Sequence, residues 1–270
     1  ALARYNPDGS LDTTFSGDGL LTTAFSSDNE EAYAVALQVD GKIVVAGTAY
    51  ASYDSHNDFA LARYNPDGSL DTTFSDDGML TTAFGSSNDV VLAVALQTDG
   101  KIVAAGYADT GSDDFALARY NPDGSLDTTF SDDGMLTSDF DSGSDFAYAV
   151  ALQADGKIAT AGSSYTSSYT GSNLDFALAR YNPDGNLDTT FSGDGLLTTD
   201  FGRKDYDYAR AVALQADGEI VVAGETWDGS SIDFALARYT VVDSGNFTYN
   251  PNGQFEWLAN GETAIETFSY

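Results

Sequence analysis

The chain has 270 residues, 42% of them hydrophobic, which is enough to bury a core in one domain or two. Its 11 Lys and Arg residues against 42 Asp and Glu residues give a formal net charge of −31, which argues against nucleic acid or an anionic membrane as a partner because phosphate groups would be repelled. Cysteine is absent and histidine occurs once, at His56, so disulfides, cysteine-ligated metals and cysteine nucleophiles are excluded. No apolar run approaches the roughly 20 residues of a membrane helix, so we expect no membrane insertion.

The dominant feature of the sequence is an internal repeat. The string ALARY begins at Ala1, Ala60, Ala116, Ala177 and Ala235, with spacings of 59, 56, 61 and 58 residues. We divide residues 1–239 into four repeats at 1–59, 60–115, 116–176 and 177–239, and the pattern breaks in residues 240–270. Because the first residues look like the middle of a repeat, we expect the chain to be a piece of a longer protein.

Each repeat contains four short apolar or alternating runs, from which we predict four β-strands. In chain order these runs are DFALARY, LLTTAF, YAVALQ and KIVVAG. The first connection, Asn6-Pro7-Asp8-Gly9, suits a type I turn, and Asp40-Gly41 between the third and fourth runs suits a type I′ hairpin. No 3.6-residue apolar period lasts ten residues, so we expect no helix.

Four hairpin-connected strands per repeat predict one blade of a β-propeller, and the predicted fold class is all-β. A parallel β-helix ranks second because its rungs are usually shorter. The four blades can form a closed ring or the C-terminal part of a larger propeller. The fifth ALARY strand can complete a blade that is cut by the chain ends, or it can begin a linker.

Arginine occupies the same position of every ALARY strand. These residues could form a ring of ligand-binding arginines, or each could make a structural ion pair with an Asp of the long NPDGSLDTTF loop. An Arg and an Asp at fixed places in every repeat favour the structural pair, for example Arg63 with Asp71.

The NPDGSLD loop also places oxygen-bearing side chains at alternate positions, as calcium-binding loops do. However, its glycine is at the fourth position rather than the sixth, and no bidentate Glu follows at the twelfth. We favour turn chemistry and keep Ca²⁺ as a hypothesis. The candidate ligands are Asn6, Asp8, Asp12, Asn65, Asp67, Asp71, Asn121, Asp123, Asp127, Asn182, Asp184 and Asp188.

The connections after the second and fourth strands vary among the repeats, whereas the other two connections are nearly invariant. In a meandering blade the two variable connections lie on one face, and their Tyr, Ser, Gly, Asn and Asp content is typical of a recognition surface. Unconstrained loop drift explains the same composition equally well. The candidate ligand-binding residues are Tyr50, Tyr53, Asp54, Tyr107, Asp109, Tyr165, Tyr169, Tyr206, Trp227 and Asp228.

The blocks ALARYNPDGSLDTTFSxDG and AVALQxDGKIxxAG closely resemble the bacterial delta-60 repeat over residues 1–239. The resemblance implies a β-propeller in a large secreted or surface protein, and the repeat itself does not imply an enzymatic activity. The segment NFTYNPNGQFEWLANGETAIETFSY resembles the C-terminal half of a VCBS-type or cadherin-like tandem repeat. That resemblance implies a partial immunoglobulin-like β segment at residues 240–270, which borrows strands, packs on the propeller or continues past Tyr270.

Two classes of function follow. The first is a non-enzymatic extracellular scaffold or ligand-binding module of a bacterial adhesin-like surface protein, which binds a glycan or a surface protein through its variable-loop face and adjoins other domains. The alternative is a carboxylate-based glycoside hydrolase or lyase on a propeller scaffold. Asp207 and Glu225 are acids that break the repeat and are its candidate residues.

Overall fold

The computed structural model describes residues 1–26, 29–51, 56–141, 143–168, 171–202, 206–227, 229–241 and 247–248. Over these residues the chain is all-β, and all four strand-like runs of the repeat form strands, which confirms the predicted fold class. None of the described residues belongs to a helix that could cross a membrane.

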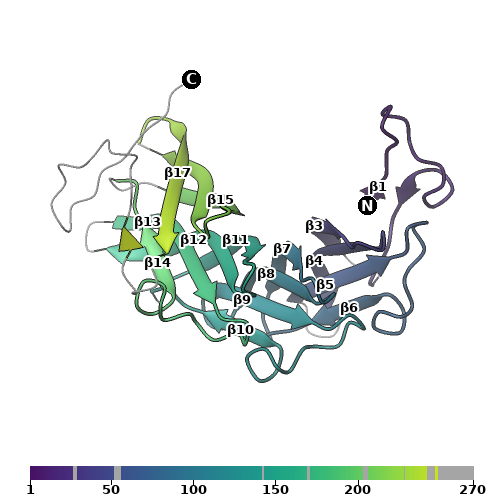
Figure 1. The fold of residues 1–270 in the computed structure, drawn as a ribbon, viewed down its shortest axis with the longest axis horizontal. Helices are drawn as coiled ribbons and strands as arrows, with labels where there is room; N and C mark the ends of the chain where they lie inside the picture. The colour runs from purple at the N-terminus through teal and green to yellow at the C-terminus, as the bar shows by residue number, and fades with distance from the viewer. Residues whose placement is uncertain are drawn as a thin grey trace. The chain divides into compact units, whose positions relative to one another are not determined.

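The chain divides into two compact units, and the strands of the described residues pair in five antiparallel sheets. The first unit holds residues Ala1–Gly111 and Ala116–Thr137. Its sheets are the pair β1 (Leu2–Ala3) and β2 (Leu20–Leu21), then β3 (Glu30–Leu37), β4 (Ile43–Ala51), β5 (His56–Tyr64) and β6 (Met79–Thr82), then β7 (Asp89–Leu96), β8 (Ile102–Asp109), β9 (Asp113–Tyr120) and β10 (Met135–Ser138). Figure 1 shows β7, β8, β9 and β10 side by side in chain order.

The second unit holds Ser112–Phe115 at the start of β9 and the chain from Ser138 onward. Its first sheet contains β11 (Asp145–Leu152), β12 (Ile158–Ser168), β13 (Gly171–Tyr181) and β14 (Leu196–Thr199). Its second sheet contains β15 (Asp207–Leu214), β16 (Ile220–Trp227), β17 (Ile232–Val241) and β18 (Phe247–Thr248). Apart from residues 240, 241 and β18, the segment predicted to be immunoglobulin-like lies outside the described residues.

Each four-stranded sheet is a meander of four consecutive strands. Its boundaries do not coincide with those of the sequence repeats, which we defined to begin at ALARY. A sheet begins with the AVAL strand of one repeat, and its third strand is the ALARY strand with which the next repeat begins. Such a meander has the strand order of a propeller blade. The closure of four blades into a ring stays a prediction.

The hairpin between β3 and β4 is not the predicted type I′ turn. Gly41 has a positive φ of 85°, but Asp40 does not, and a type I′ turn needs both. The Gly41 N–H donates to the Gln38 carbonyl at 2.9 Å and the Gln38 N–H donates to the Lys42 carbonyl at 2.9 Å. These bonds define a three-residue loop, a type I turn followed by a left-handed glycine, which leaves Asp40 unstrained.

One glycine in each four-stranded sheet is required by a β-bulge rather than by a turn. The first strand of each four-stranded sheet changes register once, in β7 between Val91 and Ala93. At this point the second strand approaches so closely that a Cβ on Gly106 would lie 1.8 Å from the Val90 carbonyl oxygen. The KIVVAG run therefore needs its glycine for close approach of two backbones.

The core consists of the aromatic and aliphatic side chains that recur in every repeat. In the first unit Phe59, Leu61 and Phe74 are fully buried, and Phe59 packs on Phe84 with ring centroids 4.8 Å apart. In the second unit Phe176 packs on Phe201 in the same way. These recurring aromatic residues therefore form the centre of the core in both units.

Candidate functional site

The strand arginine forms a buried ion pair, as predicted. Arg63 Nε lies 2.7 Å from Asp71 Oδ2, both side chains are only 4% exposed, and Lys42 Nζ reaches the same oxygen at 3.1 Å. Arg63 also donates to the Pro122 carbonyl at 2.6 Å and lies over the Phe74 ring. Equivalent groups are Lys101, Arg119 and Asp127, and Lys157, Arg180 and Asp188. Lys42 follows the hairpin glycine, so its contact with Asp71 confirms that the two invariant connections share one face.

The pKa of Asp71 reflects this neutralisation. Burial alone would raise the pKa, but hydrogen bonds from Thr73 and Lys42 and the charge of Arg63 together hold it well below its usual value. Asp127 behaves in the same way, and the pKa of Asp188 falls to about 2. These groups lock the loop to the sheet.

The other proposed calcium ligands of the loops also take part in local hydrogen bonds. Asp67 Oδ1 accepts from the N–H and the hydroxyl of Ser69, and Asn65 Nδ2 donates to the Ser69 hydroxyl. The same bonds recur around Asn6, Asp8 and Asp12 and around Asn121 and Asp123, and similar ones around Asn182 and Asp184. Among the described residues, clusters of three carboxylates suited to a metal ion lie elsewhere. Calcium binding by the loops stays a prediction.

Four candidate ligand-binding residues occupy one equivalent position at the end of the second strand of a sheet. Each donates its backbone N–H to the carbonyl of the residue just before the start of the first strand, at 3.0–3.3 Å. These residues are Tyr50, Asp109, Tyr165 and Trp227, and their acceptors are Asn29, Asn88, Ser144 and Tyr206. Tyr107 lies two residues before Asp109 in β8. Tyr53, Asp54, Tyr169 and Asp228 lie outside the described residues.

The structure brings two predicted residues together at one end of the sheet β15–β18. The rings of Tyr206 and Trp227 stack with centroids 6.0 Å apart and planes 14° apart, and the two residues are 41% and 38% exposed. They line an open cavity of about 190 Å³, together with Tyr208, Glu225, Thr226 and Ile232. This volume is below the roughly 300–1,000 Å³ of drug-sized pockets, so it suits one ring of a larger ligand.

A charged pair borders these rings, and sequence reasoning did not connect it to them. Arg210 lies 2.6 Å from Glu225 and its guanidinium stacks over the rings of Tyr208 and Tyr148, at 4.5 and 4.9 Å from the ring centroids. The signal in the sequence is a break of the repeat. The equivalent positions of the other sheets hold the neutral pairs Tyr33 and Thr48, Leu92 and Tyr107, and Tyr148 and Ser163. We call Tyr148, Tyr206, Tyr208, Arg210, Glu225 and Trp227 the aromatic patch.

The two acids predicted to break the repeat do not form a carboxylate pair, and the prediction is wrong for Asp207, which recurs as Asp89 and Asp145 at the same place in other sheets. Asp207 pairs across the sheet with Thr226, whereas Glu225 pairs with Tyr208. Because neighbouring residues of a strand point to opposite faces, the side chains of Asp207 and Glu225 lie on opposite faces of the sheet. Asp207 is also fully buried.

Buried aspartates recur where one sheet meets the next within each unit. Asp89, Asp145 and Asp207 each begin the first strand of a sheet, and each accepts a hydrogen bond from the N–H of a Phe, at 2.7–2.9 Å. Burial raises the pKa of each to about 6, and acids of the preceding ALARY strand add to the rise: Asp58 for Asp89, Asp114 for Asp145 and Asp175 for Asp207. At two of these places a further Asp, Asp139 or Asp200, completes a cluster of three carboxylates.

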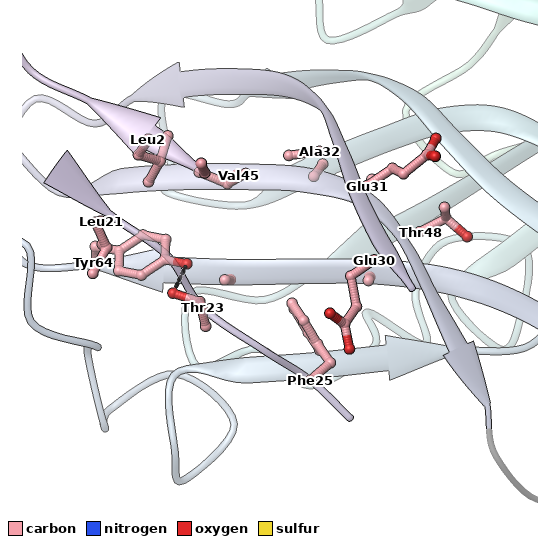
Figure 2. Close-up of a pocket in the computed structure, with 15 residues that line it drawn as sticks. Leu2, Leu21, Thr23, Phe25, Glu30, Glu31, Ala32, Val45, Thr48 and Tyr64 are labelled. Carbon is pink, nitrogen blue, oxygen red and sulfur yellow. Dashed lines mark hydrogen bonds between the residues drawn. The ribbon is translucent and has the colours of Figure 1, made fainter. Parts of the chain in front are cut away.

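A second, smaller cavity of about 60 Å³ lies in the first unit, between the β1–β2 pair and the sheet of β3, β4 and β5. Figure 2 shows Leu2 and Leu21 near Val45 and Tyr64 at one end, and Glu30 and Glu31 near the other. The Tyr64 hydroxyl donates to Thr23 at 2.8 Å. The cavity has room for a few water molecules only, so it carries no functional argument.

A family model described as "Domain of unknown function (DUF5122) beta-propeller" matches residues 1–15, 38–74, 97–130, 153–191 and 215–244, more than half of the chain. The match confirms the propeller part of the resemblance, and nothing tests the VCBS-type part. Comparison with curated proteins finds no match.

Among solved structures, a protein of unknown function from Dyadobacter fermentans is 14% identical with a TM-score of 0.53, and the alignment covers 83% of this chain and 70% of that one. The periplasmic gluconolactonase of Pseudomonas aeruginosa is 19% identical with a TM-score of 0.47, covering 81% and 56%. A catalytically inactive virginiamycin B lyase from Staphylococcus aureus is 12% identical with a TM-score of 0.43, covering 79% and 58%. Only the likeness to the Dyadobacter protein has a TM-score above 0.5 and carries an argument. At 14% identity it concerns the fold alone. The chain spans 56–70% of the lengths of these proteins.

Proposed function

Because the chain belongs to the DUF5122 β-propeller family, we propose that it is a non-enzymatic binding module and that it binds a glycan through the aromatic patch. The stacked, half-exposed rings of Tyr206 and Trp227 carry this proposal. Stacked rings offer a rigid, flat apolar surface to the face of a sugar ring, at a low cost in conformational entropy.

The charged pair beside the rings supplies the polar part of recognition. Ligand sites combine apolar walls with a few placed polar groups, and the Arg210–Glu225 pair can donate to and accept from sugar hydroxyls. The patch departs from the repeat that generates the rest of the sheet. A position that only had to support the blade would keep the neutral residues found in the other sheets.

The test is a glycan array followed by calorimetric titration of each hit. We expect Trp227→Ala to weaken binding at least tenfold, because a central aromatic anchor contributes about 2 kcal/mol or more and a tenfold change corresponds to about 1.4 kcal/mol. Tyr5→Ala is the matched control, since Tyr5 is 62% exposed in the first unit and should leave affinity unchanged. Equal affinity of wild type and Trp227→Ala would contradict the proposal.

The same glycans separate this function from the alternative, a carboxylate-based glycoside hydrolase or lyase. Each hit is incubated with the protein and the products are separated by chromatography. Binding without turnover supports the binding module. Turnover that one Asp→Asn or Glu→Gln change abolishes would replace it with the enzyme.

We further propose that the module works outside a bacterial cell, in an adhesin-like surface protein with neighbouring domains. Its acidity suits an environment where salt screens self-repulsion. Detection of the protein in the cytoplasmic fraction alone would contradict this location.

A further inference from the structure

A group of oxygen atoms lies at the start of the sheet β11–β14 and contains no residue of the aromatic patch. Asp114 of β9, Asp139 after β10 and Asp145 of β11 each offer one carboxylate oxygen, and these three atoms lie within 4.8 Å of one another. Asp145 is fully buried, and its Oδ2 accepts from the Phe140 N–H at 2.8 Å. Its Oδ1 has no hydrogen-bond partner. A buried carboxylate oxygen without a partner is costly unless a proton or a cation compensates its charge.

A buried hydroxyl also faces this group of carboxylates. Ser164 of β12 is fully buried and pairs with Asp145 across the sheet. Its Oγ makes no hydrogen bond of normal geometry, yet it lies near enough to the Asp145 carboxylate to lower the pKa of that group. The cluster therefore adds a neutral oxygen to its three carboxylates.

A second cluster of three carboxylates with a facing hydroxyl lies at the start of the sheet β15–β18. Asp175 of β13, Asp200 after β14 and Asp207 of β15 form the second cluster within 4.8 Å. Asp207 is fully buried, its Oδ1 has no partner, and Thr226 occupies the place of Ser164 opposite it.

The equivalent place in the first unit keeps the two buried acids and lacks the other two oxygens. Asp58 and Asp89 correspond to Asp114 and Asp145. Ala83 stands where Asp139 stands in the next repeat, and Ala108 pairs with Asp89 where Ser164 pairs with Asp145. The third acid and the hydroxyl are thus present together at two places and absent together at the third. Packing of the sheets does not require them.

We propose that Asp114, Asp139 and Asp145 bind one Ca²⁺ and that Asp175, Asp200 and Asp207 bind a second, each assisted by the facing hydroxyl. Carboxylate and hydroxyl oxygens suit a hard cation, and ligands on opposite sides of Ca²⁺ are roughly 4.6–5.2 Å apart, against about 4.2 Å for Mg²⁺. Asp139 and Asp200 are exposed, which gives the ion a path from solvent. These sites are distinct from the NPDGSLD loops.

The experiment is calorimetric titration of the full chain with CaCl₂ after treatment with EDTA. We expect two ions to bind wild type, one to bind Asp139→Ala or Asp200→Ala, and none to bind the double variant. Because Asp139→Ala recreates the arrangement at Ala83, the variants should fold, and circular dichroism checks that they do. Asp67→Ala, in an NPDGSLD loop, is the matched control and should keep two ions.

Thermal melting gives a second readout. Calcium should raise the melting temperature of wild type above its value in NaCl of equal ionic strength, and it should leave the double variant unchanged relative to that NaCl control. The proposal is overturned if wild type binds no calcium at millimolar concentration, or if the double variant still binds two ions.

Discussion

Arg63 and Arg4 occupy the same position of the repeat but differ in their surroundings. Arg63 and its partner Asp71 are each 4% exposed, whereas Arg4 and its partner Asp12 are 32% and 20% exposed. A buried pair has lost its hydration and depends on its partner, while water screens and solvates an exposed one. The same ion pair should therefore differ in its contribution to stability.

We expect Arg63→Met to lower the free energy of unfolding by about 3 kcal/mol, because it leaves Asp71 buried with only Lys42 to compensate its charge. Arg4→Met, in the same unit, should cause a much smaller loss. Urea denaturation of the two variants measures the difference, and equal losses would contradict the structural role of the buried pair.

Asp89 is predicted to make stability depend on pH. Burial and the charges of Asp58 and Asp109 raise the pKa of Asp89 to about 6, above its unfolded value near 4. The folded state therefore holds a proton that the unfolded state releases between pH 4 and pH 6. The stabilisation from that proton is complete below about pH 4 and is lost as pH rises through 6.

Asp89→Asn replaces the protonated acid with a neutral side chain of similar shape. Its melting temperature should equal that of wild type at pH 4 and exceed it at pH 8, with the difference growing between these values. The measurement is a series of thermal melts in EDTA. A difference between the two proteins that does not change with pH would contradict the raised pKa.

At the scale of elements, the phenylalanine that precedes each ALARY string shows how much packing against a neighbouring segment stabilises a sheet. Phe176 in β13 is 1% exposed and contacts Phe201 edge to face at 4.8 Å. Phe234 holds the equivalent position in β17 and is 82% exposed. Phe176 and Phe234 thus allow a comparison of the same side chain in a buried and in an exposed environment.

Phe176→Ala should lower the free energy of unfolding by about 3–5 kcal/mol, because it removes a buried ring and leaves a cavity. Phe234→Ala should change it by less than about 0.5 kcal/mol. Chemical denaturation of both variants gives the comparison. A large loss from Phe234→Ala would show that this face is covered in solution.

Strand positions were predictable from the sequence because the same four runs recur in each repeat. The type of the β3–β4 hairpin was not, because Asp-Gly also suits a type I turn with a left-handed glycine, and only the backbone angle of Asp40 distinguishes the two. The boundaries of the sheets were not predictable either, because a periodic sequence does not show at which strand each sheet begins.

The candidate sites were predictable only in part. Arg63 and Asp71 were paired correctly because both recur at fixed places. Tyr206 and Trp227 were named singly, but their stacking follows from the register of β15 and β16, which spacing in the sequence does not reveal. The carboxylate clusters were missed because their members come from different sheets, and spacing in the sequence does not reveal which sheets are neighbours.

At the scale of the whole molecule, the charge of −31 has two components with different environments. Asp71, Asp127 and Asp188 are buried beside Arg and Lys side chains, so added salt will hardly screen them. Turn acids such as Asp8 and Asp67 are exposed and accept hydrogen bonds from their own loops. The exposed acids therefore supply most of the self-repulsion that salt can relieve.

We expect NaCl to raise the melting temperature, because a change from 0.1 to 1 M shortens the screening length from about 10 Å to about 3 Å. Thermal melts in EDTA separate this effect from calcium binding. The exposed turn acids Asp8, Asp67, Asp123 and Asp184 can be changed to Asn, which forms the same turns without the charge. The quadruple variant should melt higher at 0.1 M NaCl and gain less from added salt. If the melting temperature of wild type instead falls with salt, attraction between charges outweighs repulsion in this protein, and the turn acids are stabilising.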